Sequence, residues 1–292
     1  MDDFTPFSLE NTLQCGQLFR WKKNDGSWTG IVAERVIKIR QKANVLEFEG
    51  ANASFIKGYF RLDDDLQLIA SCINRDHLME RALHRFPGLR IARQDPWECL
   101  ISYICATYKN IPAIKSMISE LSRRFGQKIL FEGKSHFSFP TPDSLANATV
   151  NDLSSCGLGF RARAVREAAK HVRTGKVDFD SLKKASCKTA KSELLCLPGV
   201  GNKVADCTLL FSLEKLSAFP VDIWMKRVIK DHYSQNFDAL FDKSLTEGNS
   251  LSTKAYERIS EFAQGYFGKF AGYAQQYLFH YYRSLRNKAC KS

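Results

Sequence analysis

The spacing of apolar residues changes from strand-like to helical within the first third of the chain. Residues 36–40 and 46–49 alternate apolar and polar positions, which is typical of half-buried antiparallel strands. Asn24, Asp25 and Gly26 separate two short apolar runs and predict a hairpin turn. From about residue 95 onward the apolar positions recur at helical spacing. The pattern therefore predicts an α+β fold, in which an N-terminal antiparallel sheet precedes a helical part.

The helical part divides into several predicted elements. We expect helices at 96–107, 113–125, 160–172 and 256–286. The stretch 126–139 is rich in Gly, Lys, Ser and Phe, and we expect a loop or an irregular connection there.

A turn between two further predicted helices, at 190–197 and 203–213, contains two glycines. Pro198 and Gly199 end the first helix, and glycine lets a backbone approach a ligand closely. Amides before a helix favour an anion such as phosphate. The amides here belong to Gly199, Gly201 and Asn202. On the other side of the turn, a monovalent cation could bind the backbone carbonyls of Leu195, Leu197 and Val200. An ordinary helix–glycine–helix corner is the alternative.

Lys203 and Asp222 give this turn a possible chemistry. Lys203 precedes Cys207 by four residues, so both share a helix face. Asp222 comes just before a helical pattern at 223–228 and is typical of an N-cap. The alternative interpretations are that Lys203 is an ordinary solvated cation and that Asp222 is only a helix N-cap. An uncharged amine and an ionised carboxylate in one dry pocket could instead cut a glycosidic bond, because desolvation makes an amine nucleophilic.

These residues resemble those of a known family. Residues 197–203 (LPGVGNK) and Asp222 resemble the helix-hairpin-helix, Gly/Pro-rich loop and aspartate of the DNA base-excision glycosylases. Four segments are similar to those of the 8-oxoguanine DNA glycosylases and occur in the order found in that family. They are 15–21 (CGQLFRW), 93–100 (RQDPWECL), 158–163 (LGFRAR) and 203–207 (KVADC). The resemblance covers nearly the whole chain.

The resemblance implies an antiparallel sheet domain and two helical lobes, with DNA held at the cleft between the lobes. We expect the sheet domain at 1–87 and a helical lobe with the loop that reads the opposing base at 88–190. The helix-hairpin-helix catalytic lobe and the C-terminal helix are expected at 191–292. The implied partner is double-stranded DNA that contains 8-oxoguanine.

The family also implies a pocket for a base extruded from the duplex. Cys207 and Phe279 would form its two walls, and Gln275 would bind the edge of the base. The carbonyl of Gly16 would accept the N7 hydrogen, which 8-oxoguanine has and guanine lacks. A helical Cys or Phe is more often a core residue, so only their joint placement with Lys203 favours a site.

Mechanistically, the resemblance implies a bifunctional enzyme. Lys203 would attack the sugar C1′ and displace 8-oxoguanine, and the resulting Schiff base would allow strand cleavage by β-elimination. Asp222 would stabilise the oxocarbenium-like transition state. No metal and no cofactor are required. Some relatives carry a four-cysteine iron–sulfur loop near the C-terminus, where this chain has only Cys290.

The chain departs from the eukaryotic members where they hold the orphaned cytosine. Tyr108 and Ala113 stand at the positions of an asparagine and an arginine, near Asn110. Phe160 replaces a tyrosine wedge, and Arg161 is kept. The loss of these hydrogen bonds to cytosine predicts weaker discrimination among the four bases opposite the lesion. Tyr108 or Phe160 would fill the space left in the base stack.

A further departure is Trp224, which replaces a phosphate-binding histidine and can still donate its indole N–H. Two other function classes remain open. A monofunctional glycosylase for alkylated bases would not need Lys203. A non-catalytic DNA-binding scaffold would not need Lys203 and Asp222 together.

Composition is consistent with a DNA partner. The formal net charge of +12 and the pI of about 9.3 favour polyanions. The sequence shows neither a membrane-spanning run nor an N-terminal signal pattern. Nine cysteines without CxxC pairs are typical of a reducing compartment. We expect an intracellular monomer, in the cytoplasm or nucleoid if the source is prokaryotic.

Overall fold

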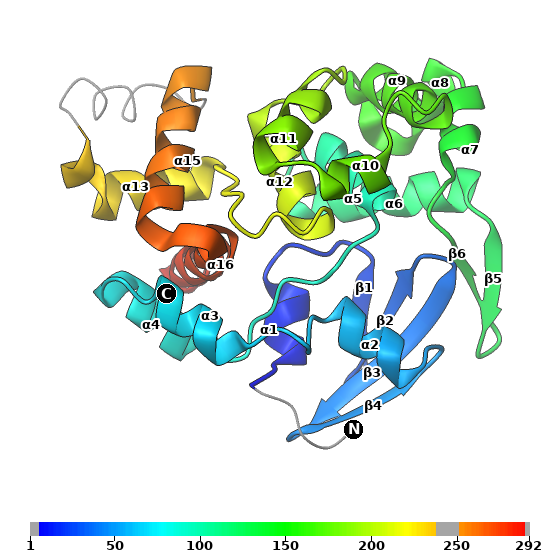
Figure 1. The fold of residues 1–292 in the computed structure, drawn as a ribbon. Coiled ribbons are helices and arrows are strands. Elements are labelled where there is room, and N and C mark those ends of the chain that lie inside the picture. Colours follow the sequence, from blue (N-terminus) through cyan, green and yellow to red (C-terminus); the bar gives the residue numbers. More distant parts are fainter. Residues whose placement is uncertain (1–5, 238–250, 290–292) are drawn as a thin grey trace.

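The computed structural model describes residues 6–237 and 251–289 (Figure 1). Cys290 therefore lies outside the described residues. A sheet formed near the N-terminus is followed by a mainly helical remainder, which confirms the predicted α+β class.

The N-terminal sheet is a four-stranded antiparallel meander in the order β1-β2-β3-β4. At the predicted hairpin, Asn24 pairs with Ser27, and the two turn residues have φ of 46° and 77°. Positive φ at both positions matches the turn that suits twisted two-residue hairpins. The strands are β1 (Trp21–Asn24), β2 (Ser27–Val32), β3 (Arg35–Lys42) and β4 (Val45–Glu49).

One small hydrophobic core lies between this sheet and two helices, α1 (Leu9–Gln14) and α2 (Ala53–Tyr59). Trp21 is 2% exposed, and Ile37 and Phe60 are completely buried. Ile37 and Ile39 of β3 belong to this core, as do Leu46 and the partly buried Phe48 of β4, which accounts for the alternation seen in the sequence.

The remaining helices form one larger core. They are α3 (Leu66–Ile73), α4 (His77–Arg85), α5 (Pro96–Cys105), α6 (Ile111–Phe125), α7 (Pro142–Asn147), α8 (Val150–Leu153), α9 (Arg161–Arg173), α10 (Phe179–Lys184), α11 (Cys187–Leu195), α12 (Asn202–Ser212), α13 (Ile223–His232), α15 (Thr253–Phe267) and α16 (Ala271–Ala289). Short helical turns occur at Ser154–Leu158, Ser234–Asn236 and Gly268–Phe270.

Helices α3 and α4 lie within the first predicted segment, 1–87, yet their buried side chains belong to the larger core. Both helices pack against α16 from the opposite end of the chain (Figure 1). The sheet region therefore passes into the helical core before residue 87, and the expected boundaries at 87 and 190 stay predictions.

Two predictions of local structure are wrong. The stretch 126–139 is a second hairpin, of β5 (Lys128–Phe131) and β6 (Lys134–Phe137), rather than an irregular connection. Positive φ at Glu132 and Gly133 closes its turn. The single helix expected over 256–286 is two helices, because Gly268 adopts a φ of 69° and ends α15.

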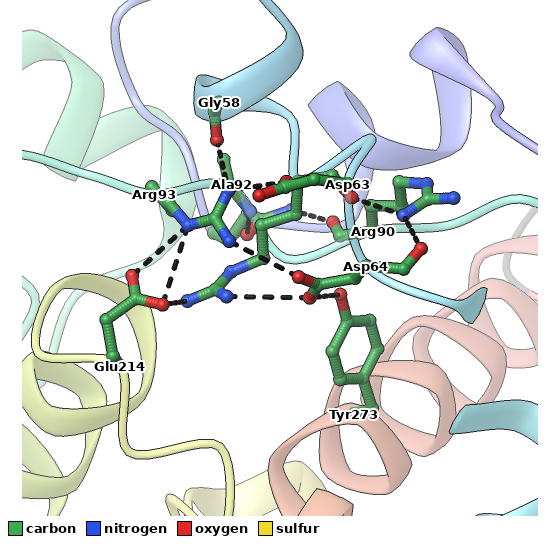
Figure 2. Close-up of polar contacts among 10 residues, drawn as sticks. Gly58, Asp63, Asp64, Arg90, Ala92, Arg93, Glu214 and Tyr273 are labelled. Carbon is green, nitrogen blue, oxygen red and sulfur yellow. Dashed lines mark hydrogen bonds and ion pairs between the residues drawn. The ribbon is translucent and has the colours of Figure 1, made fainter. Parts of the chain in front are cut away.

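A network of charges joins segments that are distant in the sequence (Figure 2). Arg93 pairs with Asp63 at 2.7 Å and with Asp64 at 3.2 Å. Arg61, only 1% exposed, lies 2.7 Å from Glu214, just beyond the end of α12. These pairs fix the end of α12 to the connection between α2 and α3.

Two more residues extend this network. Arg90 donates to the backbone carbonyl of Asp64 at 3.0 Å. The Tyr273 hydroxyl, on α16, donates to the Asp64 carboxylate at 3.3 Å. The network therefore links the N-terminal region with both α12 and α16 (Figure 2).

Candidate active site

The glycine turn joins α11 to α12, as the sequence predicts. Gly199 has a φ of 78°, and a Cβ built there would lie 2.5 Å from the Cβ of Ala164. Glycine is therefore required at this position both for its backbone conformation and for its close packing. Gly201 has an ordinary φ of −98°, and a Cβ there would meet open space.

Gly201 is also the N-cap of α12, and it gives that helix no side-chain cap. The first amides of α12 are thus left without a side-chain acceptor, as the predicted anion site requires. In the neighbouring half of the turn, the Leu197 carbonyl already accepts from the Val200 amide at 3.1 Å. The cation site at Leu195, Leu197 and Val200 stays a prediction.

Lys203 and Asp222 lie close enough to interact electrostatically. Burial raises the pKa of Asp222, while the Lys203 charge opposes this rise. Asp222 Oδ1 accepts from the amides of Trp224 and Met225 at 3.0 and 2.9 Å. Asp222 is therefore the N-cap of α13 and also a carboxylate facing the Lys203 charge, so the two interpretations of this residue are compatible.

A buried hydrogen-bond chain, which the sequence did not reveal, holds the segment before Asp222. The Tyr256 hydroxyl on α15 accepts from the Val221 amide at 3.1 Å and donates to Asp206 at 2.7 Å. Asp206 is 1% exposed and also pairs with Lys191 at 2.8 Å. The chain connects α12, which carries Lys203, with the residue that precedes Asp222.

The predicted walls of the base pocket come from α12 and α16. Cys207 is 3% exposed, and burial raises the pKa of its thiol, so it presents a neutral group. Gln275 is 5% exposed, and its Oε1 is buried without a hydrogen-bond partner. A buried amide oxygen without a partner is costly unless a ligand satisfies it.

Gly16 lies against Phe279. Its φ is 97°, and a Cβ there would lie 3.1 Å from Phe279 Cε1 and 2.6 Å from Arg283 Nη1. Gln276 holds the preceding residue, since its amide donates to the Cys15 carbonyl at 3.0 Å. The N-terminal turn and α16 thus meet at the position expected for the base.

Sequence reasoning missed Arg283. Its guanidinium lies over the Phe279 ring at 5.1 Å and interacts electrostatically with Asp222. Its spacing of four residues from Phe279 and eight from Gln275 places all three on one helix face, which was a usable signal.

The expected opposing-base residues lie on two adjacent loops. Tyr108 is 83% exposed with a φ of 54°, and Phe160 is 70% exposed. Asn110 caps α6 by accepting from the Ala113 amide at 3.0 Å. Large aromatic side chains held in water at loop tips are suited to insertion into a base stack.

Arg161 is 4% exposed and braces these loops. Its Nε donates to the Thr107 carbonyl at 2.9 Å, and its Nη1 donates to the Leu158 carbonyl at 3.1 Å. It also lies over the Phe160 ring at 4.3 Å. Direct contact with an opposing base, as predicted, would require these bonds to open.

Trp224, the predicted phosphate donor, lies in the first turn of α13 and is half-buried. Arg227 lies 5.1 Å from the centre of its ring. This pairing adds a positive charge beside the indole.

The described part of the chain offers neither a metal-binding cluster nor a membrane-spanning helix. Residues 6–237 and 251–289 contain no group of three or more His, Cys, Asp or Glu side chains arranged to hold a metal ion. Across the same residues, no helix combines the length and the apolar character needed to span a membrane.

Two family models together match most of the chain. Residues 3–100 match the N-terminal domain of 8-oxoguanine DNA glycosylase. Residues 101–247 match the HhH-GPD superfamily of base excision DNA repair proteins.

The chain is similar to curated proteins along nearly its whole length. It is 29% identical to a probable N-glycosylase/DNA lyase from Methanothermobacter thermautotrophicus, covering 95% of this chain and 94% of the relative. It is 32% identical to an N-glycosylase/DNA lyase from Saccharomyces cerevisiae, and the match covers 93% of this chain and 82% of the relative.

A solved structure is also similar. It is the Clostridium acetobutylicum 8-oxoguanine glycosylase/lyase in complex with double-stranded DNA that contains cytosine opposite the lesion. The TM-score is 0.85 and the identity is 33%, covering 96% of this chain and 93% of that one.

Proposed function

The chain belongs to the N-glycosylase/DNA lyase family within the HhH-GPD superfamily of base excision DNA repair proteins, and from this we propose that it excises 8-oxoguanine from duplex DNA and cleaves the strand. The observation that supports the proposal is the electrostatic interaction between Lys203 and the Asp222 carboxylate. Lys203 lies at the end of the glycine turn, whose amides suit a DNA phosphate, and Asp222 is the N-cap of α13.

The reaction begins when Lys203, after losing a proton, attacks C1′ of the damaged nucleoside with its free amine. As the bond to the base breaks, positive charge develops on the sugar, and the carboxylate of Asp222 stabilises it. The Schiff base that forms at Lys203 then permits β-elimination on the 3′ side. No step in this sequence needs a cofactor or a metal ion.

Base selection uses the groups from α12 and α16. The extruded purine lies between Cys207 and Phe279, and Gln275 bonds its edge. Gly16 provides the carbonyl that accepts the N7 hydrogen of 8-oxoguanine. Guanine has a bare acceptor at N7, so its approach to this carbonyl would leave two acceptors unpaired.

Reduction with borohydride tests the covalent step. The protein should become trapped on duplex DNA containing 8-oxoguanine, and Lys203→Gln should abolish trapping because the amine is gone. The matched control is Lys188→Gln, which removes an exposed lysine of α11. A trapped complex that survives Lys203→Gln would reassign the nucleophile.

The same experiment separates the two other function classes. A monofunctional glycosylase would release the base without any trapped complex. A DNA-binding scaffold would bind the duplex and release no base. Either result would contradict the proposed activity.

We also propose relaxed discrimination of the base opposite the lesion. Tyr108 and Phe160 project as exposed aromatic rings, which stack on any base. Single-turnover excision should therefore proceed at comparable rates with each of the four bases opposite 8-oxoguanine. A strong preference for cytosine would contradict this proposal.

The remaining expectations form part of the proposal. The partner is duplex DNA, bound by a monomer, and the phosphate contacts come from Gly199, Gly201, Asn202 and Trp224. The expected setting is intracellular.

A further inference from the structure

We propose that Arg283 is a catalytic residue, whose guanidinium contacts the extruded purine and stabilises the negative charge that the purine gains as the glycosidic bond breaks. This inference rests on the function proposed above. It gives the departing base a charged partner, whereas the other proposed contacts are uncharged groups of Gly16, Gln275, Cys207 and Phe279.

The geometry places the guanidinium at the expected edge of the base. Arg283 Nη1 and Phe279 Cε1 converge on Gly16, at 2.6 and 3.1 Å from the position that a Cβ would take. The guanidinium lies 5.1 Å from the centre of the Phe279 ring. A purine that stacks on Phe279 and bonds to Gly16 would therefore lie within reach of this cation.

One nitrogen of the guanidinium is available for such a contact. Nη2 donates to the Gln14 carbonyl at 2.6 Å and approaches His280 Nδ1 at 3.5 Å. Nη1 is buried and has no hydrogen-bond partner. A buried donor without a partner is costly, and an oxygen or nitrogen of the base would satisfy it.

The charges around Arg283 also suit this role. Asp222 interacts with it electrostatically, so the guanidinium lies within electrostatic range of that carboxylate. Burial and the Arg283 charge lower the pKa of His280 to about 4. His280 is therefore neutral at physiological pH, and Arg283 is a positive group at this edge of the pocket.

The chemistry requires such a partner for the leaving group. The bond between C1′ and the base nitrogen breaks, and its electron pair goes to the purine. Lys203 Nζ forms the new bond to C1′, and the ammonium that results releases one proton, which the purine anion takes up. A fixed cation beside the purine stabilises the transition state before that proton arrives.

The test compares two substrates, because only one of them contains the base. Arg283→Met should slow excision of 8-oxoguanine by about 10²-fold, the scale for loss of a preorganised electrostatic group. Strand cleavage at a preformed abasic site should be unchanged. Arg35→Met, which removes an exposed arginine 5.2 Å from Phe55 in the sheet domain, is the matched control and should leave both activities unchanged.

A second measurement distinguishes catalysis from support of the N-terminal turn. The defect of Arg283→Met should shrink for 8-oxopurines whose ring substituents make them better leaving groups. A purely structural defect would be the same for all of them. If Arg283→Met does not fold, Arg283→Lys serves instead, with a smaller defect and the same trend, because it keeps the charge and loses the planar fork.

Three outcomes would overturn the inference. The first is an equal loss of rate on 8-oxoguanine and on the abasic site, and the second is a normal rate of 8-oxoguanine excision by Arg283→Met. The third is a loss of rate that does not depend on the leaving-group ability of the base. An inactive wild-type protein would instead contradict the function proposed above.

Discussion

At the scale of single residues, Asp222 has two tasks that its two oxygens can share. Oδ1 holds the first turn of α13, through the amides of Trp224 and Met225. In the proposed reaction, the carboxylate as a whole carries the charge that stabilises the positive charge developing on the sugar. Its pKa is raised by burial, so the folded protein holds this charge at a cost to its stability.

Asp222→Asn should therefore separate activity from stability. Asparagine caps a helix as well as aspartate does, and it has no charge to desolvate. Single-turnover excision should fall by about 10²-fold, while the melting temperature at neutral pH should rise. A fall in both quantities would show that the carboxylate mainly serves the fold.

The dependence on pH follows from the same shift. Because the pKa of Asp222 is raised in the folded protein, its ionisation weakens the fold as pH rises through the window between the ordinary and the raised value. The gain in melting temperature for Asp222→Asn should disappear below that window. In wild-type protein, excision should be lost on acidification at a higher pH than an ordinary aspartate would give.

At the scale of elements, the hairpin between α11 and α12 could be predicted because its signals are local. Glycine, proline and the flanking helical patterns all lie within a few residues. The two glycines nevertheless differ, since only Gly199 has a positive φ and a close neighbour.

Alanine substitutions should show this difference. Gly199→Ala should destabilise the protein by about 1–3 kcal/mol, because the left-handed conformation strains alanine and Ala164 crowds the new methyl group. Gly201→Ala, its matched control, should change the free energy of unfolding by less than about 0.5 kcal/mol. Chemical denaturation measures both, and equal losses would contradict the strain argument.

Other features could not be read from the sequence because they depend on contacts between distant segments. Tyr256 reaches Asp206 across fifty positions, and no local pattern marks that pair. The β5–β6 hairpin has strands of four residues, too short for a clear alternation. The break at Gly268 was hidden because apolar spacing continues on both sides of it.

At the scale of the whole molecule, the charge network of Figure 2 joins regions with separate cores. Glu214 is central to it, since it pairs with Arg61 at 2.7 Å and with Arg93 at 3.4 Å. Lys203 and Glu214 lie at opposite ends of α12. The network therefore fixes the far end of the helix that carries Lys203, the proposed nucleophile.

Glu214→Gln should destabilise the protein by about 1.5–3 kcal/mol, because buried Arg61 loses a charged partner. Glu132→Gln is the control, since its pair with Lys38 is 36–45% exposed and should contribute less than about 1 kcal/mol. Urea denaturation measures both variants. Equal effects would mean that the network contributes no more than a surface ion pair.

Tyr108 and Phe160 keep their rings in water whenever no DNA is bound. Exposed aromatic rings at loop tips favour self-association of the protein. The formal net charge of +12 opposes this association, because the molecules repel one another. Added salt shortens the range of that repulsion. Concentrated salt should therefore do two things at once in a purified sample: weaken the binding of duplex DNA and allow self-association through Tyr108 and Phe160.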